Sequence, residues 1–317
     1  MKSKLSKQLR PWGLAISTSL LLGPTIVQAG QTAFMSEFNV SSFEEKRSDV
    51  RYESQGVNGT VYFSQIKHTV TGPYEKQPFL NQSGHVSLFL NDVGTKYGDS
   101  NNLKSDGSNF KIEGLYTQRS YPLVIGLSYE REEDDDELSG TVLETSTEET
   151  IKFTIGGRAS RNTSVTTSFY SISHEQEDKS SSISSEPEKH RTSGLSVDYE
   201  GVYTYSAGYS LGHAIQVRFL QDELYTAKSE SNDLEIDVRE ISYQFDYYPL
   251  PSIGLGFNIG RQDADKYSDS KVFGFSIRPF INKHIPIKLA YTNRDFSGSE
   301  DTSPDIKTVK FSFGFRI

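Results

Sequence analysis

The sequence predicts an all-β fold: one transmembrane, antiparallel, up-and-down β-barrel of about 14 strands. Three observations lead to this prediction. The chain begins with an export signal, it ends with a strand that has one apolar and one polar face, and strand-like segments recur between turns along its length. Barrels of about 12 or 16 strands also fit, because strand boundaries read from a sequence are uncertain by a few residues.

The final strand, residues 309–317, alternates without exception. Successive side chains of a strand point to opposite faces, so one face is apolar and the other is polar or small. In a transmembrane barrel the apolar face contacts lipid and the polar face lines an aqueous interior. The apolar residues are Val309, Phe311, Phe313, Phe315 and Ile317, and those between them are Lys310, Ser312, Gly314 and Arg316.

Residues 1–29 have the features of a secretory signal peptide, with cleavage expected between Ala29 and Gly30. A basic segment precedes an apolar run over residues 14–22, and small residues follow at the cleavage position. The run is too short for a membrane anchor, because a spanning helix needs about 20 apolar residues. Residues 30–317 are therefore expected to form the barrel domain. The basic residues are Lys2, Lys4, Lys7 and Arg10.

The composition, with a formal net charge of −9, excludes several classes of protein. The predicted signal peptide holds four basic residues and no acidic ones, so the mature chain is more negative still. Nucleic acid is not an expected partner, because binding to phosphates needs basic patches. Cysteine is absent, which excludes a disulfide framework in this exported chain. A mean hydropathy of −0.54 agrees with a barrel, in which only half of each strand meets lipid.

The N-terminal half of the mature chain contains seven expected strands, in which the alternation is less regular. The first two cover residues 34–45 and 57–66. In the third, Phe89 is an apolar exception on the polar face, and the seventh has mixed phase. The third to seventh cover residues 86–91, 110–116, 123–130, 151–155 and 165–172.

The C-terminal half alternates more regularly and supplies seven further strands. Phe, Tyr, Ile, Leu and Val occupy every second position, with small, polar or charged residues between them. A turn is expected at residues 248–251, because its two prolines cannot occupy a central strand. The strands cover residues 195–200, 215–219, 241–247, 253–260, 273–278, 285–292 and 309–317.

Short connections alternate with longer acidic ones, as in a barrel with tight turns on one side and extended loops on the other. Acidic oxygens can bind Ca²⁺, but the densest acidic run lacks the glycine and ligand spacing of a calcium loop. No metal site and no cofactor are therefore predicted. The expected longer loops are the acidic run 131–137 with Glu144, Glu148 and Glu149 after it, and residues 174–190 and 294–305.

The final strand resembles the C-terminal signal strand of Gram-negative outer-membrane β-barrels, although that strand usually ends in Phe and this chain ends in Ile317. Residues 72–80, which begin Gly-Pro-Tyr and end Phe-Leu, resemble a segment of porin-like outer-membrane proteins. The resemblance implies a barrel in the cell outer membrane, with both termini in the periplasm and residues 72–80 in a long periplasmic connection. It also implies insertion by the barrel-assembly machinery and contact with outer-membrane lipid and lipopolysaccharide.

Charged residues on the polar strand faces are the candidate functional residues. An arginine or lysine in hydrocarbon costs about 2–4 kcal/mol at the bilayer midplane, so these side chains are expected to point inward and line a pore. Basic residues concentrate in the later strands, and opposed rows of charge would set ion selectivity. The same charges could instead pair and fill a narrow lumen. The predicted pore-lining residues are Lys152, Arg218, Arg278, Lys288, Lys310, Arg316, Glu113, Glu130, Asp198 and Asp246.

Glycines on the same faces have two interpretations. They either leave open space in the lumen or make room for neighbouring arginine and tyrosine side chains. Strand number does not decide between them, because about 14 strands lies between filled barrels of 8 and open ones of 16–18. These glycines are Gly126, Gly254, Gly256, Gly260, Gly274 and Gly314.

Together with the resemblance, these features predict a porin-like channel for passive diffusion of small hydrophilic solutes. A closed structural or adhesive barrel with acidic surface loops is an alternative, and a barrel-embedded hydrolase is a third. No catalytic residue is predicted and an enzyme is not expected, because none of the six histidines has an inward Ser or acid at a spacing that implies a triad. The chain also lacks a nucleotide-binding loop, a zinc-ligand spacing and a G-x-S-x-G motif.

Overall fold

A computed structural model of the protein describes residues 33–47, 50–67, 72–97, 103–118, 121–138, 141–179, 188–225, 235–264, 269–297 and 305–317. The predicted signal peptide, its cleavage position and the centre of the predicted loop 174–190 lie outside these residues.

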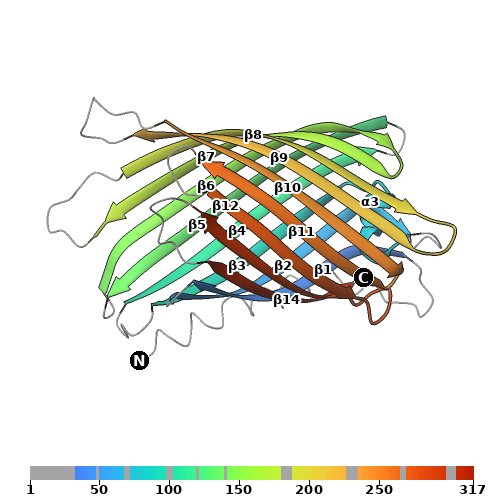
Figure 1. Cartoon of the computed structure of the whole chain (residues 1–317), viewed down its shortest axis with the longest axis horizontal. Coiled ribbons are helices and arrows are strands. Elements are labelled where there is room, and N and C mark those ends of the chain that lie inside the picture. The colour runs from blue at the N-terminus through green and yellow to red at the C-terminus, as the bar shows by residue number, and fades with distance from the viewer. Residues whose placement is uncertain are drawn as a thin grey trace.

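The described residues form one closed barrel of fourteen antiparallel strands, which confirms the predicted fold class and strand number (Figure 1). The strands are β1 (Ala33–Arg47), β2 (Val50–Lys67), β3 (His85–Tyr97), β4 (Leu103–Gln118), β5 (Tyr121–Leu138), β6 (Thr141–Ser160), β7 (Thr163–Asp178), β8 (Glu188–Thr204), β9 (Ser210–Tyr225), β10 (Glu235–Leu250), β11 (Ile253–Ala264), β12 (Asp269–Pro279), β13 (Ile287–Ser297) and β14 (Ile306–Arg316). Each strand pairs with its neighbours in the sequence, and β1 pairs with β14 to close the ring. The connection between β2 and β3 contains a 3-10 turn, η1 (Tyr74–Lys76), and one turn of α-helix, α3 (Gln77–Leu80).

No helix in the described part of the chain is long and apolar enough to cross a membrane.

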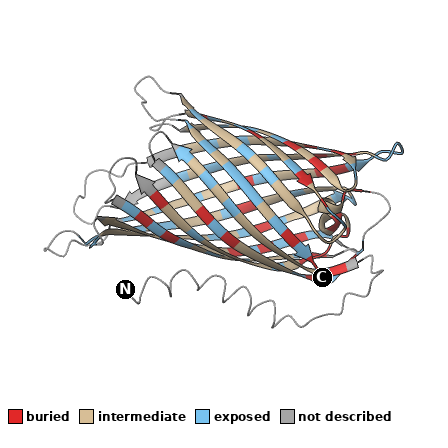
Figure 2. Ribbon diagram, turned by 90° about the horizontal axis from the view of Figure 1, so that it is seen from below, coloured by how far each residue is buried: buried red, intermediate tan, exposed pale blue. Residues whose placement is uncertain are grey.

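The outer surface of the barrel is apolar. Along β14, Phe311 and Phe313 are 48% and 42% exposed on the outside, whereas Gly314 and Arg316 are buried on the inside. Figure 2 shows exposed residues alternating with less exposed ones along strands all around the barrel. This alternation is the pattern of a barrel that meets lipid outside and a polar lumen inside. Exposed apolar residues on other strands include Leu127, Ile151, Phe169, Phe219, Ile241, Ile259 and Phe273.

The last residue seals the seam between β1 and β14. The carbonyl oxygen of Ile317 accepts hydrogen bonds from the backbone amides of Met35 and Ser36, at 2.8 and 2.9 Å. The amide of Ile317 donates in return to the carbonyl oxygen of Ser36, at 2.9 Å. The seam therefore has no open edge where the chain ends. We refer to this end of the barrel as the C-terminal end.

The strands differ in length, and this corrects one prediction. β5 and β6 have 18 and 20 residues, whereas β12, β13 and β14 have 11 each. The acidic run 131–137, predicted as a loop, lies within β5 and pairs with β6, so that prediction is wrong. Beyond the lipid, water solvates the carboxylates while the neighbouring strand satisfies the backbone, and Thr145 donates to Asp135 at 2.7 Å. Glu144, Glu148 and Glu149 likewise lie in β6.

The predicted loop 174–190 is also partly strand. His174 in β7 and His190 in β8 lie directly opposite each other, with ring centroids 5.8 Å apart. Residues 294–297 similarly belong to β13, so the third expected loop begins later than predicted.

Most buried side chains of the described residues are polar, the reverse of a soluble domain. The one buried hydrophobic cluster among them consists of Phe34, Tyr62 and Ile66, near the C-terminal end of the barrel. The rings of Phe34 and Tyr62 pack edge to face, with centroids 5.6 Å apart. This cluster therefore lies near the end of β2, from which the connection to β3 leaves the wall.

The two faces of β14 should respond differently to the same charge. Phe313→Asp removes an apolar contact with lipid and places a carboxylate there, so it should destabilise the barrel by at least about 2 kcal/mol. Ser312→Asp adds the same charge to the lumen face and should be tolerated. The measurement is the folded fraction after refolding into lipid vesicles, read from the mobility shift of unheated samples on gels. Equal losses in both variants would contradict the face assignment.

Candidate functional site: a plug in the barrel lumen

The connection between β2 and β3 folds back into the barrel at its C-terminal end, and Figure 1 shows α3 there within the ring of strands. We call residues 72–84 the plug. This segment was expected to be a long connection, and it is one. It occupies the lumen, however, and the sequence did not predict that placement.

Polar side chains fix the conformation of the plug. Gln77 is fully buried, and its Nε2 donates to the carbonyl oxygens of Gly72 and Pro73, at 3.3 and 3.2 Å. The Nδ2 of Asn81 donates to the carbonyl oxygens of Gln77 and Lys67, at 2.8 and 2.9 Å, which ties the plug to β2. Gly72 has a φ of +111°, a left-handed conformation that favours glycine. These contacts hold a segment too short to form a stable helix alone.

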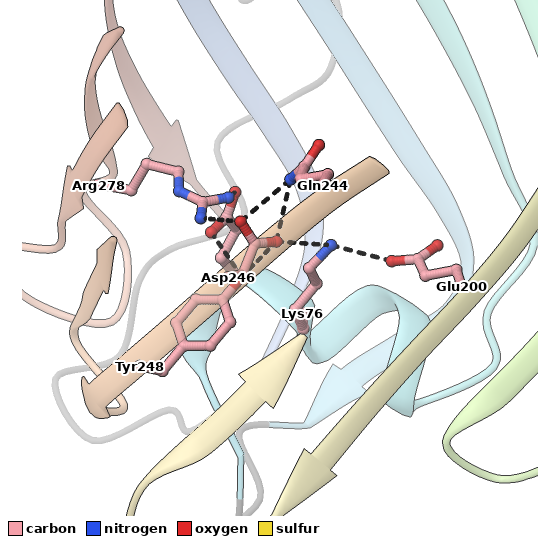
Figure 3. Close-up of polar contacts among 7 residues, drawn as sticks. Lys76, Glu200, Gln244, Asp246, Tyr248 and Arg278 are labelled. Atoms are coloured by element: carbon pink, nitrogen blue, oxygen red, sulfur yellow. Dashed lines mark hydrogen bonds and ion pairs between the residues drawn. The ribbon is translucent and has the colours of Figure 1, made fainter. Parts of the chain in front are cut away.

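A row of alternating charges joins the plug to the wall (Figure 3). The Nζ of Lys76 lies 2.9 Å from Glu200 Oε1 on β8 and 3.8 Å from Asp246 Oδ2 on β10. Arg278 on β12 pairs with Asp246 and, at 2.9 Å, with Glu75 Oε1 of the plug. Asp246 and Arg278 are only 2% and 4% exposed, so each needs its opposite charge to offset the cost of burial.

Neutral side chains complete the network. The hydroxyl of Tyr248, a residue only 2% exposed, donates to Glu75 Oε2 at 3.1 Å. The Nε2 of Gln244 donates to both carboxylate oxygens of Asp246, at 3.1 and 3.0 Å. The carboxylates of Glu75 and Asp246 are therefore bound on more than one side.

Two inward-facing glycines make room for this network. A Cβ atom at Gly254 would lie 2.9 Å from the ring of Tyr248. A Cβ at Gly256 would lie 2.8 Å from Arg278 Nη2 and 2.9 Å from Asp246 Oδ1. At these two positions the glycines therefore accommodate arginine and tyrosine side chains and do not leave open space.

The plug contacts strands on nearly opposite sides of the barrel. Arg316 on β14 donates from Nη1 to the carbonyl oxygen of Tyr74 at 2.7 Å, and its Nε pairs with Glu37 Oε2 at 2.7 Å. The guanidinium of Arg158 on β6 lies 4.4 Å from the ring centroid of Phe79. Other contacts come from β2, β8, β10 and β12, so the plug crosses the lumen.

The wall keeps the Lys76 ammonium charged. Burial alone lowers the pKa of a lysine. Here the carboxylates of Glu200, Glu75 and Asp246 outweigh burial and raise the pKa of Lys76 above its ordinary value. Lys76 therefore presents a full positive charge to Glu200 and Asp246 throughout the physiological pH range.

Two adjoining polar cavities lie in the lumen. The first, about 270 Å³, is lined by residues of β10–β13. The second, about 210 Å³, is lined by residues of β10–β14, among them Arg278, Lys288 and Lys310. Gln244 and Asn258 line both, so the two cavities lie side by side along the same wall.

All ten residues predicted to line a pore lie at inward-facing positions of their strands. They divide into three groups: some hold the plug, some pair along the wall and two line the second cavity. Whether they line a conducting path stays a prediction. The residues that hold the plug are Asp246, Arg278 and Arg316. The pairs along the wall are Lys152 with Glu113 at 3.9 Å, Glu130 with Lys111 at 3.4 Å, Arg218 with Glu240 at 3.5 Å, and Asp198, which accepts a hydrogen bond from Gln216. The residues that line the second cavity without an ion pair to any described residue are Lys288 and Lys310.

Sequence reasoning missed the plug residues Glu75 and Lys76 and their partner Tyr248. The prediction placed Tyr248 in a turn at 248–251, but β10 continues to Leu250, and Tyr248 points inward. One signal was available for the plug. Two opposite charges stand side by side in a connection much longer than the others at its end of the barrel.

The histidines show pairwise contacts in the described residues. The Nε2 of His85 lies 3.8 Å from Glu113, and the Nδ1 of His213 lies 2.7 Å from the hydroxyl oxygen of Tyr243. No group of three or more His, Asp or Glu side chains within the described ranges is placed to hold a metal ion.

The sequence matches no protein-family model and no curated protein. Solved structures do match. The outer-membrane protein Omp33 of Acinetobacter baumannii has a TM-score of 0.54 at 15% identity, covering 90% of this chain and 99% of that chain. A deletion mutant of the TodX monoaromatic hydrocarbon channel has a TM-score of 0.49 at 9% identity, covering 90% of each chain. A loop-deletion mutant of OmpT, an outer-membrane protein of Vibrio cholerae, has a TM-score of 0.46 at 11% identity, covering 90% and 99%.

The chain has the fold of bacterial outer-membrane β-barrels. The likeness to Omp33 shows the fold alone. Two features of the described residues agree with this fold: the strands form a closed ring of paired backbones, and the outer surface is apolar. A barrel with this outer surface is suited to lipid.

Removing the arginine at the centre of the network should destabilise the outer-membrane barrel. Arg278→Met leaves the buried Asp246 with only the more distant Lys76 as counter-charge, which should cost about 3–5 kcal/mol. The measurement is urea-induced unfolding in lipid vesicles. Arg261→Met is the matched control, because Arg261 pairs with Asp263 and Asp269 where all three side chains are about half exposed, and its loss should cost far less. Equal costs would show that the buried pair does not hold the interior together.

A methyl group added at Gly256 should also destabilise the barrel, but by less than the loss of Arg278. Gly256→Ala places a carbon against Arg278 and Asp246, and it should destabilise the barrel by about 1–3 kcal/mol in the same unfolding measurement. Gly59 is the control, because a Cβ there meets no atom within 4 Å. Gly59→Ala should be neutral or slightly stabilising. A Gly256→Ala barrel as stable as the Gly59→Ala barrel would mean that the network yields without cost.

Proposed function

We propose that the outer-membrane barrel is a porin-like channel for passive diffusion of small hydrophilic solutes, narrowed at its C-terminal end by the plug. The observation that carries the proposal is the unfilled polar lumen formed by the two adjoining cavities. Water and small polar solutes are stable among Ser, Thr, Asn and charged side chains, whereas an interior that served packing alone would be filled. The proposed role is transport and not catalysis.

A closed structural or adhesive barrel is the second candidate, and a specific observation favours it. The plug bonds to strands on nearly opposite sides of the ring, and its charges are matched by charges of the wall. A lumen crossed by such a segment passes little as long as the segment stays in place. The two candidates therefore differ in whether the plug leaves room or moves.

We also propose an orientation for the channel in the membrane. Both ends of the chain lie in the periplasm, so the plug narrows the periplasmic mouth and the extended β5–β6 ladder faces the cell exterior. Insertion by the barrel-assembly machinery and contact with lipopolysaccharide belong to the same proposal.

Loosening the plug should increase conductance. Glu75→Gln combined with Lys76→Met removes both charges through which the plug pairs with Glu200, Asp246 and Arg278. We expect this variant to show single-channel steps at least about twofold larger, or open more often, than the unmodified barrel in a planar bilayer. The sign follows from the loss of charge-assisted bonds, each of which stabilises the closed arrangement.

The matched control is Glu175→Gln combined with Lys189→Met. This pair, 3.3 Å apart, is exposed on β7 and β8 at the end opposite the plug. Its loss removes the same charges and should leave conductance unchanged. Folded barrels that stay silent with and without the plug substitutions would favour the closed structural barrel and reject the channel.

A further inference from the structure

The register of three strands forms a hollow in the lumen wall, centred on Ala290 of β13. Ala290 lies directly between Ser276 of β12 and Lys310 of β14. Lys288 and Thr292, two positions before and after Ala290 on the same face, complete the surround. Because alanine is the smallest of these side chains, its position is recessed, and the second cavity, about 210 Å³, lies over it. We call this site the Ala290 hollow.

The charged residues that line the Ala290 hollow are all positive, and the nearby carboxylates of Glu75 and Asp246 are paired with Arg278. Lys288, Lys310 and Arg278 line it, and none of its lining residues is acidic. Lys288 and Lys310 have no ion pair with any carboxylate of the described residues. Two ammonium groups on diagonal neighbours of adjacent strands, about 7–8 Å or less apart at their bases, repel each other unless an anion lies between them.

Arg278 adds positive charge at one side of the hollow but no free donor. Its Nη1 and Nη2 are engaged by Glu75 and Asp246. Its Nε is buried on the side of Gly254, which does not line the cavity. The charged groups that an anion in the hollow could contact directly are therefore Lys288 and Lys310.

The wall across the lumen carries paired charges. β5 lies seven strands from β12 in the ring of fourteen, so the two walls face each other. There Glu113 pairs with Lys152 and Glu130 pairs with Lys111, at 3.9 and 3.4 Å. The facing wall therefore neutralises its own charges, whereas Lys288 and Lys310 at the Ala290 hollow keep a positive charge that an anion can offset.

We propose that the Ala290 hollow binds small oxyanions, with Lys288 and Lys310 as the charged ligands and the hydroxyl groups of Ser276 and Thr292 as neutral donors. Phosphate and short carboxylates share the required chemistry, a negative charge spread over two or more oxygen acceptors. The binding of oxyanions at the hollow does not depend on the proposed channel. The further claim that small anionic solutes are the preferred transported solutes does rest on it.

The test is binding of inorganic phosphate and of acetate to the refolded barrel in detergent micelles. Phosphate is followed by broadening of its ³¹P resonance and acetate by competition against it. We expect Lys288→Gln and Lys310→Gln each to weaken phosphate binding at least about tenfold, because each removes one charge-assisted bond. Ala290→Leu should weaken it as strongly without changing any charge, because it fills the recess.

Lys271→Met is the matched control. Lys271 is exposed on the outer side of β12, so this variant loses the same charge away from the hollow and should bind phosphate like the unmodified barrel. Each variant is first shown to be folded by its gel mobility. Phosphate binding that is absent, or equal in all folded variants, would overturn the proposal. Competition by acetate would assign the site to oxyanions in general, and its failure would overturn the carboxylate half of the proposal.

Conductance separates this inference from the proposed channel. A barrel that binds phosphate at the hollow but never conducts would reject the channel and keep the oxyanion site. The opposite outcome is a barrel that conducts but in which Lys288→Gln and Lys310→Gln change neither phosphate binding nor the reversal potential in a KCl gradient. That outcome would keep the channel and reject the site.

Discussion

The continuous ring of inter-strand hydrogen bonds is the constraint on which the rest of the structure depends. In lipid each unpaired backbone group costs several kcal/mol, so β1 must pair with β14, and Ile317 completes that seam at Met35 and Ser36. Once the ring is closed, each strand offers only a lipid face and a lumen face. Charged side chains within the membrane must then share the lumen, where the plug provides counter-charges for Asp246 and Arg278.

Much of the fold could be predicted from the sequence, because a period of two residues is readable wherever one face must be apolar. That criterion failed at residues 131–137, where the strand continues outside the lipid and neither face is apolar. It also failed for the plug. The contact between Lys76 and Glu200 joins residues 124 positions apart, and neither alternation nor composition indicates which opposite charges meet across a lumen. The inward positions of Lys288 and Lys310 were predictable, but the recess between them depends on strand register.

The interior divides its charged residues between two tasks. Arg278 and Asp246 are buried, paired and surrounded by side chains that leave no space for a methyl group at Gly256, so their arrangement is fixed. Lys288 and Lys310, a few residues away on the neighbouring strands, have no such partners and face an unfilled cavity. Sequence alone groups all four as inward charges. Burial and pairing separate those that hold the interior together from those available to a solute.

The unequal strands give the barrel an oblique rim. β6 has 20 residues and β13 has 11, a difference of about 30 Å along the strand at about 3.3 Å per residue. The described turn at residues 161–162 joins β6 to β7 at the C-terminal end, so the extra length of these strands projects from the other end. The rim at that end is therefore oblique. It is high and acidic at β5 and β6, and low at β12–β14. The low side of this rim lies above the wall that carries Lys288 and Lys310.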